Sequence, residues 1–363
     1  MAQPCAVPFD SYCLDGNILT VRPCGSGHIN RTWRVVTDRD VHYLFQRVNT
    51  DVFPDIDGLM QNISRVTEHI CKKMEQSGGD SVRGTLHIVP AADGALYVRT
   101  EDGCFRCYQY IRKAIALQQP RFTEDLRRTG RAFGEFQISL SDFPADTLVP
   151  VIPNFHNTPK RLGALFRAVE EDVMGRASEV KAEVEFIRRR QEFAGILEQG
   201  IAEGRLPLRV THNDTKLNNL LFDKLTMEPV AVIDLDTVMP GTCLYDFGDG
   251  IRFGAATAAE DEQDLKLVEC DLDMYAAFTQ GWLEAFGSRM TEGELALLPL
   301  CPRVLTLECG VRFLTDYLQG DTYFATSRPG QNLDRCRTQL KLVEDMEKKE
   351  AEMTAIVREF LKK

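Results

Sequence analysis

One stretch of the chain carries side chains whose types and spacing suit phosphoryl transfer from a nucleotide. Between Thr211 and Gly248 it reads T-H-N-D-T-K-L-N-N-L-L-F-D and, after a short turn, A-V-I-D-L-D-T-V-M-P-G-T-C-L-Y-D-F-G. Such a reaction needs a carboxylate that orients the acceptor hydroxyl and takes its proton, and hard oxygen ligands that hold Mg²⁺. We expect Asp214 to be the catalytic carboxylate, and Asn219 and Asp234 to bind the metal ion.

The apolar runs beside these residues predict how they are brought together. Leu220–Phe222 and Val230–Ile233 favour strands and are separated by a polar turn that contains a proline, so they predict a hairpin. That hairpin brings Asn219, just before its first strand, close to Asp234, just after its second. A lone H-x-D-x-x-x-x-N string also occurs in unrelated chains, where Asp and Asn cap turns. The string, the hairpin and the later Y-D-F-G together favour the catalytic interpretation.

Four further residues of this stretch have expected roles. Lys216 should offset charge that develops on the transferred phosphoryl group, although a solvated loop lysine is the alternative. His212 should brace the loop through its imidazole rather than act as an acid or base. Asp246, in Y-D-F-G, should accept hydrogen bonds from loop amides as structural support. For Asp236 two interpretations stay open, because it could touch a second Mg²⁺ or cap the turn that follows.

The same stretch resembles the catalytic loop and metal-binding segment of the aminoglycoside phosphotransferase and choline kinase superfamily, the small-molecule relatives of protein kinases. Within it, H-N-D-T-K-L-N-N, I-D-L-D-T-x-M-P-G and D-F-G-D-x-I-R-F-G-A are similar to the bacterial N-acetylhexosamine 1-kinases. The likeness extends to Gly27–Asn30, His156–Pro159 and Arg312–Thr326. It implies an α+β, two-lobed protein-kinase-like fold with a small β-rich N-terminal lobe and a larger, mainly helical C-terminal lobe.

The resemblance also implies an activity and a substrate site. It implies ATP- and Mg²⁺-dependent phosphorylation of the anomeric 1-hydroxyl of N-acetylglucosamine or N-acetylgalactosamine, with ADP as the other product. Arg312 and Tyr323 are implied to contact the sugar, with His28 near its edge and Asp214 at the reacting hydroxyl. Two alternatives stay open: the same fold acting on a hexose, choline, homoserine or an aminoglycoside, and a nucleotide-binding protein without catalysis. The sequence does not rank the two N-acetylated sugars.

The first third of the chain is predicted to be rich in strands. The expected elements are strands at Leu19–Pro23, Thr32–Thr37 and Tyr43–Val48, a helix at 56–76, a hairpin of Thr85–Val89 with Leu96–Thr100, and a strand at Phe105–Ile111. Gly25, Ser26 and Gly27 form the candidate phosphate loop, because glycines let backbone N–H groups approach phosphate oxygens. A plain hairpin turn is the alternative at that position.

The third strand departs from the kinase pattern. A lysine that contacts nucleotide phosphates usually stands there, whereas this chain has Gln46 and Arg47. Arg47 could supply the missing charge and Gln46 could only form hydrogen bonds, so the choice stays open. The resemblance implies that backbone near Gln109 binds the adenine edge.

The rest of the chain is predicted to be mainly helical. Helices are expected at Thr123–Leu140, Lys160–Gly175 and Ser178–Glu203, and three more in the last third, of which Leu333–Leu361 is the longest. Residues 1–112 are therefore expected to form the nucleotide-binding lobe. Residues 113–363 should form the helical lobe with the catalytic loop, the metal site and the sugar site.

Composition limits the classes of partner. The formal net charge of −11 argues against nucleic acid and anionic membranes, which require a basic surface. No apolar stretch reaches the length of a membrane span and the N-terminus lacks an export signal, so a cytoplasmic location is expected. Eleven irregularly spaced cysteines do not suggest a disulfide framework, and Cys104 and Cys107 are expected to be core thiols rather than zinc ligands. The sequence is silent on oligomeric state.

Overall fold

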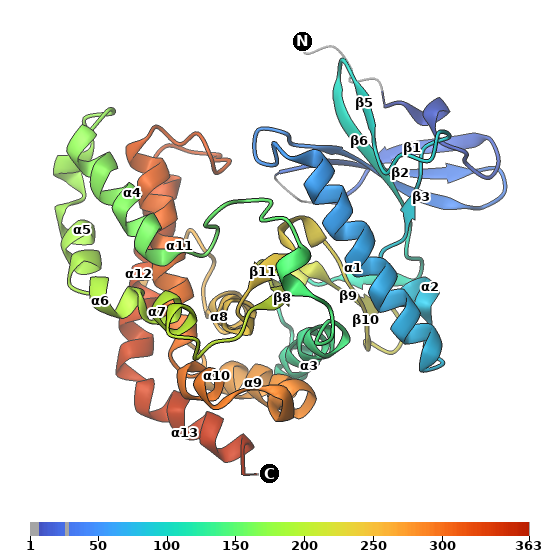
Figure 1. Cartoon of the computed structure of the whole chain (residues 1–363). Coiled ribbons are helices and arrows are strands. Elements are labelled where there is room, and N and C mark those ends of the chain that lie inside the picture. Colours follow the sequence, from blue (N-terminus) through green and yellow to red (C-terminus); the bar gives the residue numbers. More distant parts are fainter. Residues whose placement is uncertain (1–6, 26–28, 363) are drawn as a thin grey trace. The chain divides into compact units, whose positions relative to one another are not determined.

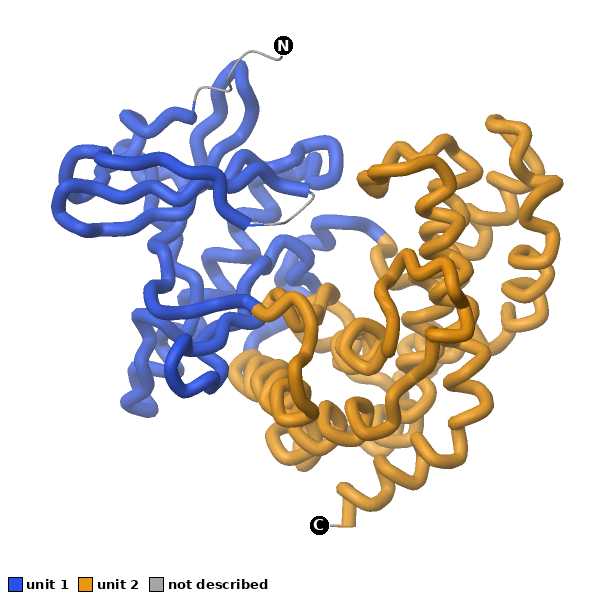
Figure 2. The backbone as a smooth tube through the Cα atoms, turned by 180° about the vertical axis from the view of Figure 1, so that it is seen from behind, with its two compact units in different colours: residues 1–116, 142–153, 220–239 blue, residues 117–141, 154–219, 240–363 orange. Residues whose placement is uncertain are grey.

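The computed structural model describes residues 7–25 and 29–362 and divides the chain into two compact units. Unit 1 comprises Met1–Ala116, Asp142–Pro153 and Leu220–Met239, and unit 2 comprises Leu117–Ser141, Asn154–Asn219 and Pro240–Lys363 (Figure 2). Unit 1 carries most of the strands and unit 2 most of the helices, which agrees with the predicted fold class. Unit 1 also includes two later segments, 142–153 and 220–239. The predicted boundary after residue 112 assigned both segments to the helical lobe.

Unit 1 is built on a six-stranded sheet in the order β1-β2-β3-β6-β4, with β5 also paired to β6 (Figure 1). Its strands are β1 (Ile18–Pro23), β2 (Arg31–Thr37), β3 (His42–Val48), β4 (Ile88–Val89), β5 (Val98–Thr100) and β6 (Gly103–Gln109). The first three predicted strands are confirmed as β1, β2 and β3, which pair antiparallel in sequence order. The predicted hairpin between β4 and β5 is wrong. Both strands pair with β6, through Ile88–Tyr108 and Val98–Phe105 respectively, so they follow one another along it.

Helix α1 (Ile56–Gln76) begins and ends where the apolar spacing predicts. The side chain of Asp55 caps its start by accepting from the backbone N–H of Gly58 at 2.9 Å. The apolar stripe is buried, and two polar side chains, Asn62 and Thr67, are buried with it. Asn62 donates to the carbonyls of Val149 (2.7 Å) and Val238 (3.0 Å), which ties both later segments to unit 1. A short helix, α2 (Ser81–Gly84), follows.

A second, three-stranded sheet in unit 1 has the order β10-β9-β7. Its strands are β7 (Ala114–Ala116), β9 (Leu220–Asp223) and β10 (Pro229–Val232). The predicted hairpin is confirmed: β9 and β10 pair antiparallel, with Leu220 opposite Val232. Asp234 follows β10 with a φ of 60°, and the 3₁₀ turn η5 (Leu235–Thr237) begins directly after it.

Unit 2 consists mainly of helices, together with the strand β8 and the end of β11. Its helices are α3 (Thr123–Ser139), α4 (Thr158–Glu171), α5 (Lys181–Arg188), α6 (Gln191–Ala194), α7 (Ile196–Ala202), α8 (Cys243–Gly254), α9 (Leu272–Phe286), α10 (Glu292–Leu297), α11 (Cys301–Leu318), α12 (Gln331–Lys348) and α13 (Glu350–Phe360). The pair β8 (Arg209–Thr211) and β11 (Met239–Gly241) flanks the catalytic stretch in sequence. No helix in the described part of the chain has both the length and the hydrophobicity to span a bilayer.

Two helices predicted to be continuous are interrupted. Residues 178–203 form α5, α6 and α7, because the chain leaves helical geometry near Arg190 and again at Gly195. Residues 333–361 form α12 and α13, which are separated at Lys349. Glycine is a poor helix former, which accounts for the break at Gly195, whereas neither glycine nor proline marks Lys349.

Helices α3 and α9 pack unusually closely because each has a glycine at the contact. A Cβ on Gly130 would lie 2.1 Å from the carbonyl oxygen of Phe278, and one on Gly281 would lie 1.9 Å from that of Arg127. Either side chain would therefore force the helices apart. The close packing fixes α3, which carries residues that contact the catalytic loop.

Candidate active site

The catalytic loop runs from His212 to Asn219, between strand β8 and strand β9, and belongs to unit 2. It ends in a 3₁₀ turn, η4 (Leu217–Asn219). Asn213 adopts a φ of 65°, a left-handed conformation that asparagine tolerates better than most residues. The Thr211 hydroxyl donates to Oδ1 of Asn213 at 2.9 Å, so the start of the loop is held locally.

Asp246, in the first turn of α8, binds the backbone of the loop through its carboxylate. Its carboxylate accepts from the backbone N–H groups of His212 (3.0 Å) and Asn213 (2.7 Å), and from the Gln137 amide (2.7 Å). These are the contacts with loop amides that the sequence leads us to expect. Burial raises the pKa of Asp246, although these partners and the His212 side chain favour the carboxylate. Asp246 thus sets the path of the backbone just before Asp214.

His212 is fully buried and packs edge-on against Phe133 and Phe136 of α3, with ring centroids 5.7 and 5.9 Å away. Its Nδ1 accepts a hydrogen bond from the backbone N–H of Asp214 at 3.2 Å. The imidazole therefore contacts the loop backbone directly, which is the arrangement expected of a bracing residue.

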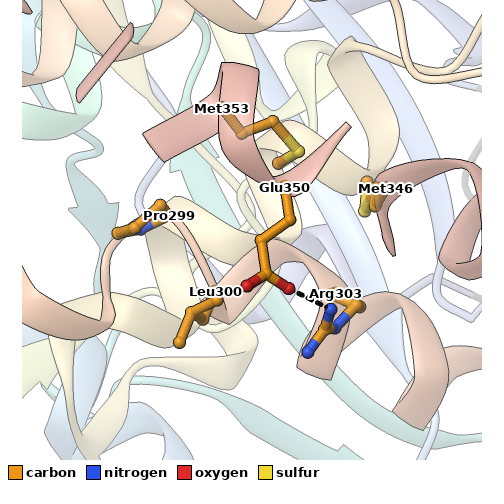
Figure 3. A pocket seen from close by; sticks show the side chains of 6 residues that line it. All are labelled: Pro299, Leu300, Arg303, Met346, Glu350 and Met353. Carbon is orange, nitrogen blue, oxygen red and sulfur yellow. Dashed lines mark hydrogen bonds and ion pairs between the residues drawn. The ribbon is translucent and has the colours of Figure 1, made fainter. Parts of the chain in front are cut away.

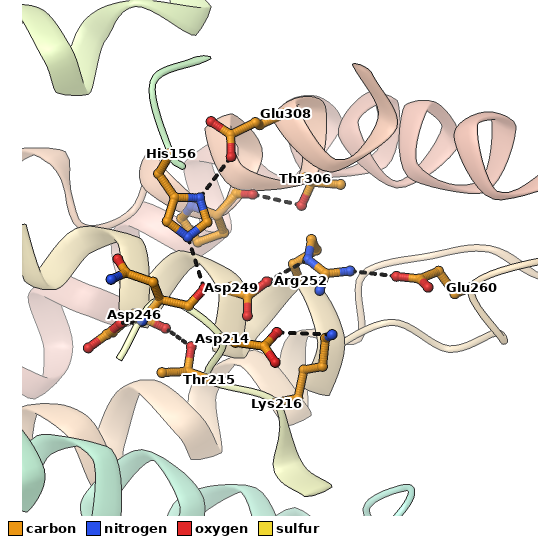
Figure 4. Close-up of polar contacts among 12 residues, drawn as sticks. His156, Asp214, Thr215, Lys216, Asp246, Asp249, Arg252, Glu260, Thr306 and Glu308 are labelled. Carbon is orange, nitrogen blue, oxygen red and sulfur yellow. Dashed lines mark hydrogen bonds and ion pairs between the residues drawn. The ribbon is translucent and has the colours of Figure 1, made fainter. Parts of the chain in front are cut away.

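Asp214, Lys216 and Asn219 form one polar group at the end of the loop. Nζ of Lys216 lies 2.9 Å from Oδ1 of Asp214, and the two side chains point toward one another in Figure 4. Nδ2 of Asn219 donates to Oδ2 of Asp214 at 2.9 Å and to its carbonyl oxygen at 2.8 Å. Burial acts to raise the pKa of Asp214, but Lys216 outweighs it and brings the pKa to about 2. Asp214 in turn raises the pKa of Lys216, so the carboxylate and the ammonium are both charged at neutral pH.

A second charged group from α8 surrounds this pair, and the sequence did not suggest a role for it. Arg252 is buried, with Nε 2.8 Å from Asp249 Oδ1 and Nη1 2.9 Å from Glu260 Oε1 (Figure 4). The other oxygen of Asp249 is buried without a hydrogen-bond partner. Arg252 also helps to lower the pKa of Asp214, so the group acts electrostatically on the catalytic carboxylate. The available signal was two opposite charges three residues apart in a helix that is buried along most of its length.

His156, from the H-N-T-P motif, supports the loop from another side. Its Nδ1 lies 2.7 Å from Oε1 of Glu308, and its Nε2 lies 3.0 Å from the carbonyl oxygen of Asn213. Thr158 donates to the other oxygen of Glu308 at 2.8 Å. Burial alone would lower the pKa of His156, but Glu308 outweighs burial and raises it. Since both ring nitrogens face acceptors, the imidazolium form fits this position.

The two residues expected to contact the acceptor, Arg312 and Tyr323, lie together in unit 2. The Arg312 guanidinium carbon is 4.9 Å from the Phe155 ring centroid, 5.8 Å from that of Tyr323 and 5.3 Å from that of Phe324. Tyr323 is 48% exposed, so its ring and hydroxyl are accessible. We call Phe155, Arg312, Tyr323 and Phe324 the aromatic–arginine patch.

Asp316 fixes the segment that carries Tyr323. Its carboxylate accepts from the backbone N–H groups of Thr322 (2.9 Å), Tyr323 (2.8 Å) and Phe324 (2.9 Å). A fourth donor is Nδ2 of Asn332 at 2.9 Å. The sequence offers Asp316 only as part of the motif R-F-L-x-D-Y-L, without its role.

In unit 1, the candidate phosphate loop is described only at its edge. Gly25 has a φ of 85°, and apart from its chain neighbours no described residue has a heavy atom within 4 Å of where its Cβ would stand. Ser26, Gly27 and His28 lie outside the described residues. Gln109, at the end of β6, donates its backbone N–H to the carbonyl of His87 at 2.9 Å. That N–H is therefore engaged within the sheet, and the adenine contact implied for Gln109 would have to use its carbonyl.

The two residues at the position of the missing lysine lie on opposite faces of the third strand. Gln46 lies opposite Arg106 of β6, and its Oε1 accepts from Nε (3.0 Å) and Nη2 (2.8 Å) of Arg106. Arg47, the next residue, points to the opposite face of the sheet, where its Nε would be 2.7 Å from a Cβ on Gly103. Alternation along the strand therefore separates Arg47 from Gln46 and Arg106, and a contact of Arg47 with the nucleotide phosphates stays a prediction.

Arg106 is buried against the segment that follows Asp234. Its Nη1 lies 2.6 Å from Oδ1 of Asp236, and its Nη2 lies 2.9 Å from Oδ2. Burial lowers the pKa of Arg106, but Asp236 foremost, with a smaller effect of Asp234, outweighs it and raises the pKa. Asp236 therefore has a partner that neither of its two sequence-based interpretations included.

Comparison with known proteins decides the family. Residues 20–285 match the phosphotransferase enzyme family (APH). The chain belongs to this phosphotransferase family. Among solved structures, the phosphotransferase is similar to a microcompartment-associated aminopropanol kinase, with 16% identity, a TM-score of 0.63, and 95% of this chain and 96% of that chain covered. It is also similar to the aminoglycoside phosphotransferase from Alicyclobacillus acidocaldarius subsp. acidocaldarius, with 14% identity, a TM-score of 0.63, and coverage of 99% and 98%. Choline kinase from Cryptosporidium parvum Iowa II matches with 13% identity, a TM-score of 0.54, and coverage of 95% and 93%.

The donor set of this phosphotransferase fits a hard divalent cation. In Asn219 the amide nitrogen is engaged by Asp214, so the oxygen is the atom of that amide suited to a cation. Asp234 supplies a carboxylate at a left-handed position, a conformation that aspartate adopts more readily than most residues. Amide and carboxylate oxygens are the ligands that Mg²⁺ prefers. The two residues are adjacent to the paired ends of β9 and β10.

A small hollow elsewhere in the phosphotransferase contains none of these residues. It has no room for a water-sized sphere and is lined by Pro299, Leu300, Arg303, Met346, Glu350 and Met353 (Figure 3). Arg303 and Glu350 form an ion pair across it, with Nη1 2.6 Å from Oε2. Its largely apolar lining joins α11 to α12 and α13.

Proposed function

We propose that the chain is an ATP- and Mg²⁺-dependent small-molecule kinase that phosphorylates the anomeric 1-hydroxyl of N-acetylhexosamines, giving hexosamine 1-phosphate and ADP. The observation that carries the proposal is the geometry of Asp214. Its carboxylate is held by the Lys216 ammonium and the Asn219 amide, and is ionised at neutral pH. Membership of the phosphotransferase enzyme family supports the reaction type.

The residues of the chain divide the work as follows. Asp214 orients the 1-hydroxyl and accepts its proton while the bond between O1 and the γ-phosphorus forms and the bond to ADP breaks. Lys216 offsets negative charge on the transferred group. Asn219 and Asp234 would hold Mg²⁺, which would supply positive charge to neutralise the nucleotide phosphates. The low pKa of Asp214 implies that it takes the proton late, as the phosphoryl group transfers, rather than beforehand.

The aromatic–arginine patch supports a neutral, ring-shaped acceptor. Sugars bind where an aromatic face stacks on the ring and polar groups meet the hydroxyls, and this patch offers both. Arg161 lies beside it, donating to the carbonyl of Phe155 at 2.9 Å. Burial foremost, and then Arg312, lowers the pKa of Arg161, so two guanidinium groups act on this region. Two nearby cations disfavour choline or an aminoglycoside and favour a sugar.

Mg²⁺-dependent ADP release against a panel of acceptors tests the proposal. The panel is N-acetylglucosamine, N-acetylgalactosamine, glucose, galactose, choline, homoserine and kanamycin. We expect turnover with the N-acetylated sugars and at most weak turnover with the rest. Turnover confined to choline, homoserine or kanamycin would contradict the acceptor assignment and leave Asp214 in its role. Nucleotide binding without turnover on any acceptor would instead support a non-catalytic nucleotide binder.

A further inference from the structure

The sheet of unit 1 buries an arginine where an apolar residue would ordinarily pack. The Arg106 side chain is only 1% exposed, and that of its partner Asp236 only 5%. A buried ion pair is costly to desolvate and is commonly no more stabilising than well-packed apolar residues. The pair therefore calls for an explanation other than stability, and its location in the sequence suggests one.

Asp236 is the centre of this group. Two residues after the proposed metal ligand Asp234, its carboxylate meets Arg106 at two points, 2.6 and 2.9 Å. Nδ2 of Asn30 donates to the same carboxylate at 2.7 Å, and Oδ1 of Asn30 accepts from the backbone N–H of Asn49 at 3.0 Å. The segment that carries Asp234 is thus fixed to β6 and to the residues that flank β2 and β3.

Gln46 completes the group from the third strand. Its oxygen accepts twice from Arg106, and its amide nitrogen donates to the Thr32 hydroxyl at 3.2 Å. A lysine at position 46 would place a second cation against Arg106, where like charges repel. Compared with the kinase pattern, the cation stands on β6, as Arg106, instead of on β3. Residue 46 of β3 accepts hydrogen bonds from it.

We propose that Arg106, acting through Asp236, positions the Asp234 segment for Mg²⁺ binding and so takes over part of the task of the missing third-strand lysine. Arg106 is a positioning residue, since its donors are directed to Asp236 and Gln46. The inference rests on the proposed function insofar as Asp234 is a metal ligand, but it does not depend on which acceptor is phosphorylated. Residues that hold metal ligands in place commonly affect metal affinity about 10- to 100-fold.

The test measures nucleotide binding without any acceptor. The dissociation constant of a fluorescent ATP analogue is measured with Mg²⁺ and with EDTA, for the wild type, Arg106→Gln and Asp236→Asn. We expect each variant to weaken Mg²⁺-dependent binding about 10- to 100-fold and Mg²⁺-free binding less than about 3-fold. Arg99→Gln, the same change at an exposed residue on β5, is the matched control and should leave both constants unchanged.

A charge-relocation variant separates positioning from general damage. In Gln46→Lys/Arg106→Gln the cation returns to the third strand and the acceptor moves to β6, so we expect Mg²⁺-dependent binding to recover to within about 5-fold of the wild type. Thermal unfolding shows which variants remain folded, and Asp236→Asn, which keeps the side-chain volume but replaces one acceptor oxygen with a donor, serves if Arg106→Gln unfolds.

Two results would count against the inference. If the folded single variants bind the Mg²⁺–nucleotide as tightly as the wild type, Arg106 and Asp236 serve only core packing and do not position Asp234. Equal losses with Mg²⁺ and with EDTA, not restored by the charge-relocation variant, would assign it to the stability of unit 1. By contrast, a wild type that binds no nucleotide at all would contradict the proposed function itself, so the two failures are distinguishable.

Discussion

Lys216 and Asp214 form an ion pair with Nζ 2.9 Å from Oδ1, two residues apart on the catalytic loop. The pair has two consequences that can be measured separately. It keeps Asp214 ionised, since Lys216 is the main influence that lowers its pKa, and it places a cation beside the reacting carboxylate.

Replacing Lys216 should therefore change both the rate and its pH dependence. Because the pKa of Asp214 is lowered to about 2 in the wild type, activity should show no acid limb attributable to Asp214 above about pH 4. Without the Lys216 cation, burial is opposed only by the weaker effects of His212 and Arg252, so the pKa of Asp214 should rise and the acid limb of kcat/KM in Lys216→Met should move to higher pH. We also expect kcat to fall about 10- to 1000-fold. Lys216→Arg keeps the charge and should keep the acid limb near its original position. An unshifted limb in Lys216→Met would argue against the ion pair in solution.

Asp316 should affect the acceptor and not the nucleotide. Its carboxylate accepts from three consecutive backbone N–H groups around Tyr323, so Asp316→Ala releases the segment that carries this ring. We expect KM for the acceptor to rise about 10- to 100-fold with little change in KM for ATP, as measured by steady-state kinetics with each substrate varied. Thr315→Ala, at the neighbouring position, is the control. Equal rises in both KM values would indicate loss of the fold rather than of the acceptor site.

Glu198 should make stability depend on pH. Its carboxyl lies in a buried environment, where Oε1 accepts from the Tyr245 hydroxyl at 3.1 Å and Oε2 is buried without a hydrogen-bond partner among the described residues. Burial raises its pKa from 4.5 to about 7. Since the folded protein holds a proton that the unfolded chain has lost, this contribution is fully present below pH 4.5 and is lost as the pH rises through 7.

Urea unfolding as a function of pH checks this. Wild-type stability should carry a component that falls by roughly 2 kcal/mol between about pH 5 and 8, and Glu198→Gln should lack that component. The difference between the two proteins isolates Glu198 from other titrating groups. If the difference stays constant over this range, the raised pKa is wrong.

Gly281 should be intolerant of a side chain. A Cβ there would lie 1.9 Å from the carbonyl oxygen of Arg127, so Gly281→Ala must separate α9 from α3, and we expect a loss of about 2 to 4 kcal/mol of unfolding free energy. Gly163→Ala is the matched control in α4, because its Cβ would meet only Nη1 of Arg167 at 3.6 Å. The control should be neutral or stabilised by about 0.5 to 1 kcal/mol. Comparable thermal melts for the two variants would contradict the close helix contact.

Local pattern was sufficient for elements whose signal lies within one segment. Helix α1, the strands β1, β2 and β3, and the β9–β10 hairpin all follow from apolar spacing and turn residues, and the structure has them in the expected places. The pairing of strands that are not neighbours in the sequence could not be predicted from local pattern. Strands β4 and β5 were expected to pair with each other because they are neighbours in sequence, whereas both pair with β6.

In the candidate site, too, residues within one motif could be predicted, whereas residues paired over long sequence distances could not. Motif spacing pointed to Asp214, Lys216 and Asn219, and the structure brings these three into contact. Arg106 was not predicted, because its partner Asp236 is far away in sequence and nothing near position 106 marks a buried cation. Asp249 and Arg252 lie within the motif D-F-G-D-x-I-R-F-G-A, but only the structure reveals that this buried pair influences Asp214.

The most direct test of the central claim identifies the product made by the wild type and by Asp214→Asn. Each protein is incubated with ATP, Mg²⁺ and N-acetylglucosamine or N-acetylgalactosamine, and the products are examined by ³¹P NMR with coupling to the sugar protons. We predict a phosphomonoester coupled to the anomeric proton, formed by the wild type and at least about 100-fold more slowly by Asp214→Asn. A phosphate on another hydroxyl, or equal rates for the two proteins, would contradict the assignment of Asp214 as the base that directs ATP to the 1-hydroxyl.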